Sequence, residues 1–219
     1  MTSTPAEPSA SRPTRDRPTR DRPTRDRKAP YSLDELLEVV AREFLERGYD
    51  ATSMEDLSRA TGRTKSSIYH HVSGKEELLR LAVARAVDAL FAVLDEPGAQ
   101  QGRAVARLEY VVRGSARVLV AELPYVTLLL RVRGNTEGER WALGRRREFD
   151  RRLSALVRDA IAEGDVRADL DPRLVTRLLF GMVNSLVEWF RPGGAHGRQE
   201  VEDALVALAF DGLRPRAKT

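Results

Sequence analysis

The segment from Thr64 to His70 carries short hydroxyls, a lysine and a tyrosine, side chains that can hydrogen-bond base edges and phosphates without filling a groove. Between Leu57 and Lys75 the chain has four cations and no acid, whereas five acids lie between positions 34 and 46. Charge sorted in this way puts a positive edge beside the hydroxyls, where a DNA duplex could bind. The alternative is a small helical subdomain with a solvated basic face.

The elements that must position this segment begin with a supporting helix. Ser32 and Glu35 have the spacing of a capping box, which predicts a helix start. Apolar residues from Leu33 onward then recur at i, i+3, i+4, i+7 and i+11, one stripe of an amphipathic helix. Gly48 is typical of the residue that ends such a helix.

Two short helices are predicted next, joined by a tight turn. Ser53 caps the first of them, and Gly62 ends it. The second runs from about Thr64 to His70, with Ile68 facing inward. A short helix, a glycine turn and another short helix, placed after a longer helix, form the helix-turn-helix pattern.

The rest of the chain is predicted to be helical, so the fold class is all-α with about nine helices. Ser73 and Glu76 indicate a capping box for a long helix that runs to about Leu94. Asp171 followed by Pro172 is an N-cap with proline at the first helical position. No alternating run is long enough for a strand bounded by hairpin turns.

Positions 33–80 resemble the N-terminal domain of the TetR family of bacterial transcriptional repressors. Order, spacing and residue type agree over about 48 positions, although Arg63, Ser66 and Val72 depart from the usual residues. The matching residues are Ala41, Phe44, Gly48, Tyr49, the run Ala51–Leu57, Gly62, Lys65, the run Ser67–His71, and the run Lys75–Leu78.

The resemblance implies a homodimer that binds a palindromic double-stranded DNA operator. Phosphate contacts are implied for Thr52, Ser53 and Lys75. Major-groove contacts are implied for Arg63, Thr64, Lys65, Ser66 and Ser67. Contacts to the DNA backbone or to bases are implied for Tyr69 and His70.

The resemblance also implies a division into a helix-turn-helix domain at 31–78, a linking helix to about 95, and an effector-binding and dimerisation domain at 96–214. The last two helices would form a four-helix bundle with the partner, and their apolar stripes fit this. The alternative is that both stripes face the protomer's own core. The candidate interface residues are Leu178, Met182, Leu186, Trp189, Val201, Leu205 and Leu208.

An effector pocket is expected among the helices of the second half. Asn184 is the most informative candidate, because a polar amide in an apolar helix needs a hydrogen-bond partner, which a ligand or the other subunit could supply. Each of the candidates could equally be a core residue. The candidate wall residues are Tyr110, Arg113, Tyr125, Leu128, Leu129, Trp141, Phe149 and Asn184.

Three consecutive arginines, Arg145–Arg147, allow two interpretations. They could form a solvated helix face paired with nearby glutamates, or an anion site at the mouth of an apolar pocket. The second interpretation suits an acyl-CoA or a fatty acid as effector. The string from Trp189 to Gly194 also resembles TetR-like regulators of lipid and acyl-CoA metabolism, over a short stretch.

Residues 1–30 are predicted to form a disordered basic arm, and residues 215–219 a tail. The arm contains Arg-Pro-Thr-Arg-Asp three times, at 12–16, 17–21 and 22–26. It could be a tail without a role, or it could follow DNA phosphates. The alternative function for the whole chain is therefore a non-specific or architectural DNA-binding protein that uses this arm.

Composition argues against several other classes of protein. The chain has no cysteine and three histidines among its 219 residues, so no metal site and no cofactor are expected. No catalytic motif such as G-x-S-x-G or a phosphate loop is present, which predicts a protein that is not an enzyme. The lack of a long apolar run or signal peptide predicts a cytoplasmic protein without membrane contact.

Overall fold

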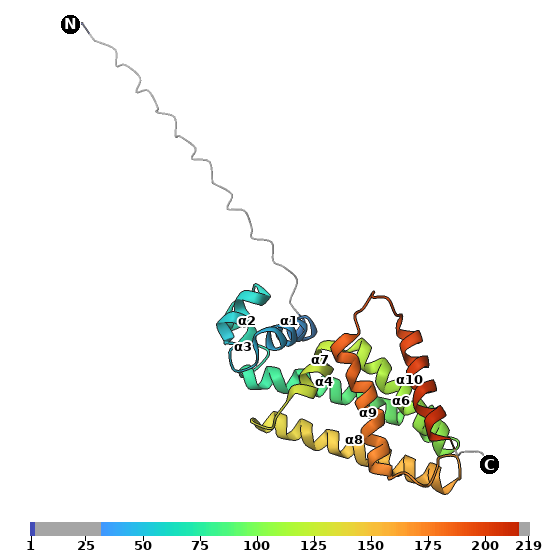
Figure 1. Cartoon of the computed structure of the whole chain (residues 1–219). Helices are drawn as coiled ribbons and strands as arrows, with labels where there is room; N and C mark the ends of the chain where they lie inside the picture. Colours follow the sequence, from blue (N-terminus) through green and yellow to red (C-terminus); the bar gives the residue numbers. More distant parts are fainter. Residues whose placement is uncertain (3–31, 215–219) are drawn as a thin grey trace. The chain divides into compact units, whose positions relative to one another are not determined.

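The computed structural model describes residues 1–2 and 32–214, and the regular structure in this part of the chain is entirely α-helical (Figure 1). This confirms the predicted all-α fold. Ten helices occur in the described residues rather than nine, because Pro97–Gln100 forms a short helix of its own, α5. The predicted arm, apart from Met1 and Thr2, and the predicted tail lie outside the described residues.

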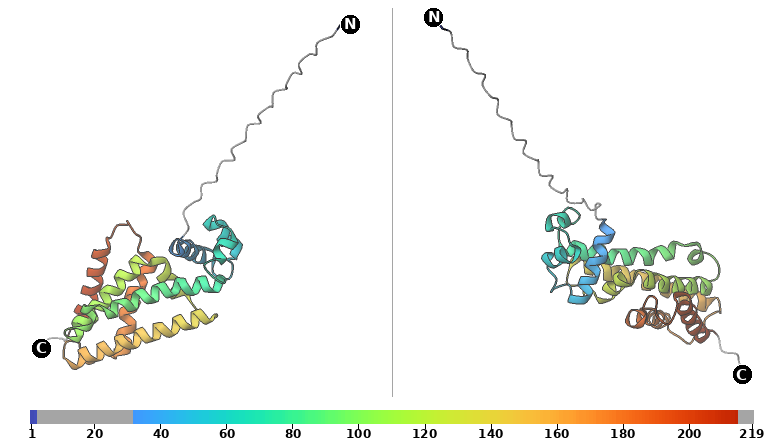
Figure 2. Two further views of the ribbon diagram at one scale, coloured as in Figure 1. Left: turned by 180° about the vertical axis from the view of Figure 1, so that it is seen from behind. Right: turned by 90° about the horizontal axis from the view of Figure 1, so that it is seen from above.

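Three helices gather at one end of the long helix α4 (Figures 1 and 2). Helix α1 begins at the predicted capping box, in which the Glu35 amide donates to the Ser32 hydroxyl at 3.2 Å and the Ser32 amide donates to the Glu35 carboxylate at 3.0 Å. It ends at Gly48, whose φ of +87° is open to glycine and rare for other residues. The four elements are α1 (Leu33–Arg47), α2 (Met54–Thr61), α3 (Lys65–Tyr69) and α4 (Lys75–Asp95).

The turn between α2 and α3 has the predicted helix-turn-helix form. Gly62 adopts the left-handed conformation at φ 64° and ψ 25°. Thr64 then caps α3 by accepting a hydrogen bond from the Ser67 amide at 3.2 Å. Ile68 is 1% exposed, so the inward orientation predicted for it is confirmed.

The start of α4 differs from the prediction. Its N-cap is Gly74, which provides no side-chain cap. Ser73 instead donates from its amide and its hydroxyl to the Glu77 carboxylate, at 2.6 and 2.7 Å. The predicted Ser73–Glu76 capping box is therefore wrong, because the serine lies one residue before the cap position and reaches one residue further along the helix.

The second half of the described chain is built around α6, which contacts α4, α5, α8, α9 and α10. Helices α7 and α8 complete the packing against α4, and α7 also contacts α1. Helix α10 packs mainly on α6 and less on α9. The elements are α6 (Ala104–Ala121), α7 (Leu123–Arg131), α8 (Glu137–Ala162), α9 (Pro172–Trp189) and α10 (Arg198–Leu213).

Helices α4 and α6 pack closely at Gly114. A Cβ atom at this position would lie 2.4 Å from Val93 Cγ1, and Val93 is itself buried. We expect Gly114→Ala to lower the free energy of unfolding by about 1–3 kcal/mol, because overpacking displaces the neighbouring helix. Urea unfolding measures the change.

Gly144→Ala is the matched control for this substitution. Gly144 also lies inside a helix but is exposed, and a Cβ there would meet nothing within 4 Å. This variant should gain roughly 0.5–1 kcal/mol from the better helix propensity of alanine. Equal effects at the two glycines would contradict the close α4–α6 packing.

Two further properties hold for residues 32–214. None of the helices there is both long and apolar enough to cross a bilayer. The same residues contain no group of three or more His, Cys, Asp or Glu side chains that could hold a metal ion.

Candidate functional site

The outer side of α3 brings most of the predicted DNA-contacting residues together. Tyr69 is 50% exposed, although aromatic side chains are more often covered. Ile68 anchors the opposite side of the helix in the core. The face is therefore polar and available to a partner; its exposed residues are Thr64, Lys65, Ser66, Ser67, Tyr69 and His70.

The two residues before α2 have different environments. Thr52 is 1% exposed, and its hydroxyl donates to the Gly48 carbonyl at 2.7 Å. The Thr52 side chain therefore lies in the interior, and its prediction as a phosphate contact stays a prediction. Ser53 is exposed and caps α2, where its hydroxyl accepts from the Asp56 amide at 3.2 Å.

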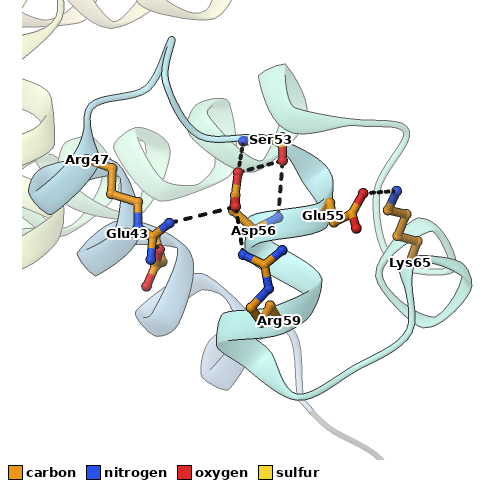
Figure 3. Close-up of polar contacts among 7 residues, drawn as sticks. All are labelled: Glu43, Arg47, Ser53, Glu55, Asp56, Arg59 and Lys65. Atoms are coloured by element: carbon orange, nitrogen blue, oxygen red, sulfur yellow. Dashed lines mark hydrogen bonds and ion pairs between the residues drawn. The ribbon is translucent and has the colours of Figure 1, made fainter.

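The first turn of α2 already holds a carboxylate (Figure 3). Asp56 accepts hydrogen bonds from the Ser53 amide at 3.0 Å and from the Ser53 hydroxyl at 2.6 Å. These bonds, with smaller contributions from Arg59 and Arg47, lower the pKa of Asp56 to about 2. A negative charge therefore satisfies this helix N-terminus in the protein without DNA.

Ion pairs hold the side chains of the three helices in place. Lys65 Nζ lies 3.1 Å from Glu55 Oε2, which links α3 to α2, and Arg47 on α1 lies 3.7 Å from Asp56 (Figure 3). Both members of the Lys65–Glu55 pair are more than half exposed. Because exposed pairs contribute at most about 1 kcal/mol, Lys65 can exchange Glu55 for a DNA acceptor at little cost.

The two remaining predicted DNA contacts flank α3. Lys75 Nζ donates to the Tyr49 carbonyl at 2.8 Å and lies 4.3 Å from the centre of the Tyr49 ring. An ammonium group has three donors, so this bond leaves others for a phosphate. Arg63 is half-buried in the turn, where its amide donates to the Ser58 carbonyl at 3.0 Å.

A cavity of about 50 Å³ lies between α4, α6, α7, α8 and α9. Three of the predicted wall residues line it, namely Leu129 on α7, Phe149 on α8 and Asn184 on α9. Asn184 is half-buried and makes no side-chain hydrogen bond within residues 32–214. Its amide is therefore available to a ligand.

Two of the predicted wall residues on α6 lie away from this cavity. The Tyr110 hydroxyl donates to Glu96, and this bond raises the pKa of Tyr110. Arg113 pairs with Asp203 of α10. Both side chains thus tie α6 to neighbouring segments on its outer sides.

The other three predicted wall residues also lie elsewhere. Tyr125 is buried on the side of α7 that faces α1. The Arg85 guanidinium lies over it, 4.7 Å from the centre of the Tyr125 ring. Leu128 is buried but does not line the cavity. Trp141 is 41% exposed in a cleft between the starts of α4 and α8.

The three consecutive arginines of α8 have three different environments. Arg145 pairs with Glu148 at 2.5 Å, and its guanidinium lies 3.7 Å from the ring centre of Phe91. Arg147 is exposed. Arg146 lines the cavity.

The cavity residues that were not named as wall candidates include Phe91 on α4, Phe180 on α9 and Arg146 itself. The rings of Phe91, Phe149 and Phe180 form an edge-to-face series with centroid separations of 5.6 and 5.4 Å. The spacing from Arg146 to Phe149 is i, i+3, and this signal could have placed both on one face of α8.

Helices α9 and α10 expose large apolar side chains. Leu208 is 73% exposed, Leu178 61%, Trp189 50% and Met182 36%. A groove of about 370 Å³ runs between the two helices, and the buried residues Leu186, Val201 and Leu205 form part of its lining. Exposed apolar patches of this kind often mark interaction sites in proteins.

The same helix α10 carries a buried carboxylate, Glu202. Glu202 is 4% exposed, its Oε1 has no hydrogen-bond partner, and the nearest cation, Arg198, lies 3.6 Å away. Burial raises the pKa of Glu202 above its ordinary value of 4.5. The Glu202 carboxyl therefore binds its proton more tightly in the folded protein than in the unfolded chain. Its contribution to the free energy of unfolding falls as the pH rises from 4.5 through the raised pKa.

We expect Glu202→Gln to stabilise the protein at pH 7 by roughly 1–2 kcal/mol, because it removes an incompletely paired buried charge. Most of the gain should be lost at pH 4, below the ordinary pKa of 4.5, where Glu202 is mainly protonated in both states. Thermal unfolding across this pH range measures the difference. Asp211→Asn, at an exposed carboxylate of the same helix, should show no such pH-dependent gain.

Both halves of the chain match known protein families. Residues 36–82 match the family profile "Bacterial regulatory proteins, tetR family", and residues 101–213 match "Tetracyclin repressor-like, C-terminal domain". The chain is 30% identical over 187 residues to the HTH-type transcriptional repressor KstR2 of Mycobacterium tuberculosis, which covers 82% of this chain and 91% of that repressor.

Solved structures agree with the sequence comparison. SCO3833, a TetR-family regulator from Streptomyces coelicolor A3, is 64% identical, covers 86% of this chain and 94% of its own, and superposes with a TM-score of 0.77. AibR, solved in complex with isovaleryl coenzyme A and operator DNA, is 25% identical, covers 81% of this chain and 97% of its own, and has a TM-score of 0.71. The chain belongs to the TetR family of bacterial transcriptional regulators.

Proposed function

We propose that the protein is a homodimeric repressor that binds a palindromic operator through α3 and is released by a small, largely apolar ligand. The observation that carries the proposal is the polar outer face of α3, held on the buried Ile68 in a chain of the TetR family. In the dimer, two α3 helices would enter successive major grooves about 34–36 Å apart.

The second copy would cover the apolar face of α9 and α10. A two-fold bundle of four helices buries self-complementary stripes of this kind. The exposed Leu178 and Leu208 would then lie in the interface, and the buried Leu186 and Leu205 would support it from beneath.

The ligand would enter the cavity between α4 and α9. At about 50 Å³ the cavity has room for little more than water, whereas ligand pockets typically measure about 300–1,000 Å³. A ligand must therefore expand the cavity and displace its walls. A fatty acid or an acyl-CoA suits the apolar lining, and AibR is a relative solved with isovaleryl coenzyme A.

Helix α7 offers a direct route from the cavity to the DNA-binding helices. Its residues Val126 and Leu129 line the cavity, and its other side contacts α1. At the end of α7, Arg131 donates to the Leu45 carbonyl on α1 at 3.2 Å. A ligand that pushes α7 outward would change the position of α1 and so the spacing of the two α3 helices.

The release follows from linkage between the two sites. A ligand that binds better when the α3 helices are wrongly spaced lowers operator affinity, and operator DNA lowers ligand affinity by the same factor. Coupling of this kind is typically ~1–3 kcal/mol.

Fluorescence anisotropy on DNA from upstream of the protein's own gene tests the proposal, with a scrambled duplex as control and a salt series for both. We expect the native fragment to bind roughly 10³-fold tighter or more. Equal, salt-sensitive affinity for both duplexes would favour an architectural DNA-binding protein. Deleting residues 1–30 separates the two functions, because a repressor should keep its operator preference without the arm.

A further inference from the structure

Arg146 is a cation beside the apolar cavity that lacks a full set of partners. Its side chain is half-buried, and desolvation lowers its pKa. Its hydrogen bond to the Leu129 carbonyl is long, at 3.4 Å. Within residues 32–214 it forms no ion pair, although a guanidinium group carries five N–H donors.

Arg146 shares its nearest opposing charge with another cation. Asp150, one turn along α8, lines the same cavity and is attracted by both Arg146 and Arg177 of α9. Arg177 is exposed and does not line the cavity, so Asp150 divides its attraction between Arg146 and a cation outside the cavity. The other acid nearby, Glu148, is already paired with Arg145 and Arg152 at 2.5 and 2.7 Å.

The rest of the cavity is suited to an apolar body. Phe91, Phe149 and Phe180 form a continuous aromatic wall. Asn184 contributes an amide without a side-chain partner in the described residues. One polar end beside an aromatic wall matches an amphipathic molecule.

We propose that Arg146 binds the oxyanion of an amphipathic effector, a carboxylate or a phosphate, whose apolar body lies against the three phenylalanine rings. A guanidinium pairs with both oxygens of such a group at once, and partial desolvation strengthens the attraction. A neutral ligand of the same shape would leave the cation unpaired beside an apolar molecule. This inference rests on the proposed effector cavity.

Isothermal titration of the full chain with octanoate, octyl phosphate and 1-octanol tests the assignment. These probes share an apolar chain and differ in the head group, so they distinguish carboxylate from phosphate and either from a neutral hydroxyl. We expect at least one anionic probe to bind roughly 10- to 100-fold tighter than octanol, as a charged hydrogen-bonded pair implies.

Substitutions at Arg146 test whether this residue causes the preference for an anionic probe. Arg146→Gln should remove the advantage of the anion and leave octanol binding within about twofold. Arg146→Lys should retain part of the preference for the anionic probe, because lysine keeps the positive charge but lacks the two parallel donors of a guanidinium. Arg147→Gln, at the exposed neighbour, should behave like the wild type. Unfolding temperatures of all three variants check that the fold is intact.

The outcomes separate this inference from the proposed function. Equal affinity for the three probes, an unchanged anion preference in Arg146→Gln, or no binding of any probe would overturn the role of Arg146. In another outcome, octanol binds as tightly as the anions and still releases the operator DNA. That result would support the repressor mechanism and contradict the role of Arg146. Octanoate that binds through Arg146 but leaves the DNA anisotropy unchanged would support Arg146 and contradict ligand release.

Discussion

Leu208→Glu is expected to convert the proposed dimer into monomers and to abolish operator binding. Leu208 is 73% exposed in the protomer, so the substitution should leave the fold intact. In a two-fold interface each copy would bury an unpaired carboxylate, and burying even one costs several kcal/mol. We expect the dimer dissociation constant to rise by at least ~100-fold.

Light scattering after gel filtration measures the result, as a fall in mass from twice 24.5 kDa to 24.5 kDa. Trp141→Glu is the matched control, because Trp141 is also a large exposed apolar residue but lies away from α9 and α10. A Leu208→Glu protein that stays dimeric would show that another surface makes the dimer.

Tyr69→Ala and Lys75→Ala are expected to weaken binding to every DNA sequence, whereas Thr64→Ala and Lys65→Ala should also change sequence preference. Each lost contact is worth about 1–3 kcal/mol, and a dimer loses it twice, so the operator dissociation constant should rise by ~30-fold or more. Loss of Lys75 should also reduce the slope of log affinity against log salt by about 1 per protomer.

Anisotropy titrations over a salt series give both quantities. Arg151→Ala removes the same charge from an exposed site on α8 and should leave the affinity and the slope nearly unchanged. Because Lys75 also contacts Tyr49, the unfolding temperature of Lys75→Ala must be compared with that of the wild type. Unchanged operator affinity in Tyr69→Ala and Lys75→Ala would contradict the proposed docking.

The features that the sequence predicted well depend on residues close together in the chain. The Ser32–Glu35 capping box spans three positions, and the Asp171 cap of α9 accepts from the Leu174 amide, also three positions away. The inward orientation of Ile68 follows from the short amphipathic period of α3. Such local signals fixed the helix-turn-helix without knowledge of the packing.

The direction of single side chains was less predictable, as Thr52 shows. Its neighbour Ser53 is exposed, and both are short hydroxyl residues before α2. The turn after α1 carries Thr52 back to the Gly48 carbonyl, which the residue type alone does not reveal. A helix-terminal pattern therefore does not reveal which of two neighbouring hydroxyl side chains is exposed.

The cavity could be predicted only in part, because its walls come from five helices. Leu129 and Phe149 line it as predicted, yet Tyr110 and Arg113 bind Glu96 and Asp203 from other segments. Those partners are set by the way that α5 and α10 pack on α6. Within the arginine run, the packing of α8 alone selects Arg146 for the cavity.

A hydroxyl-radical footprint of the full chain on the DNA upstream of its gene tests the central claim most directly. Two α3 helices in successive major grooves predict two symmetric protected windows, one helical turn of about 10–10.5 base pairs apart. Protection of a single window, or even protection along the whole fragment, would contradict a dimer that reads two half-sites.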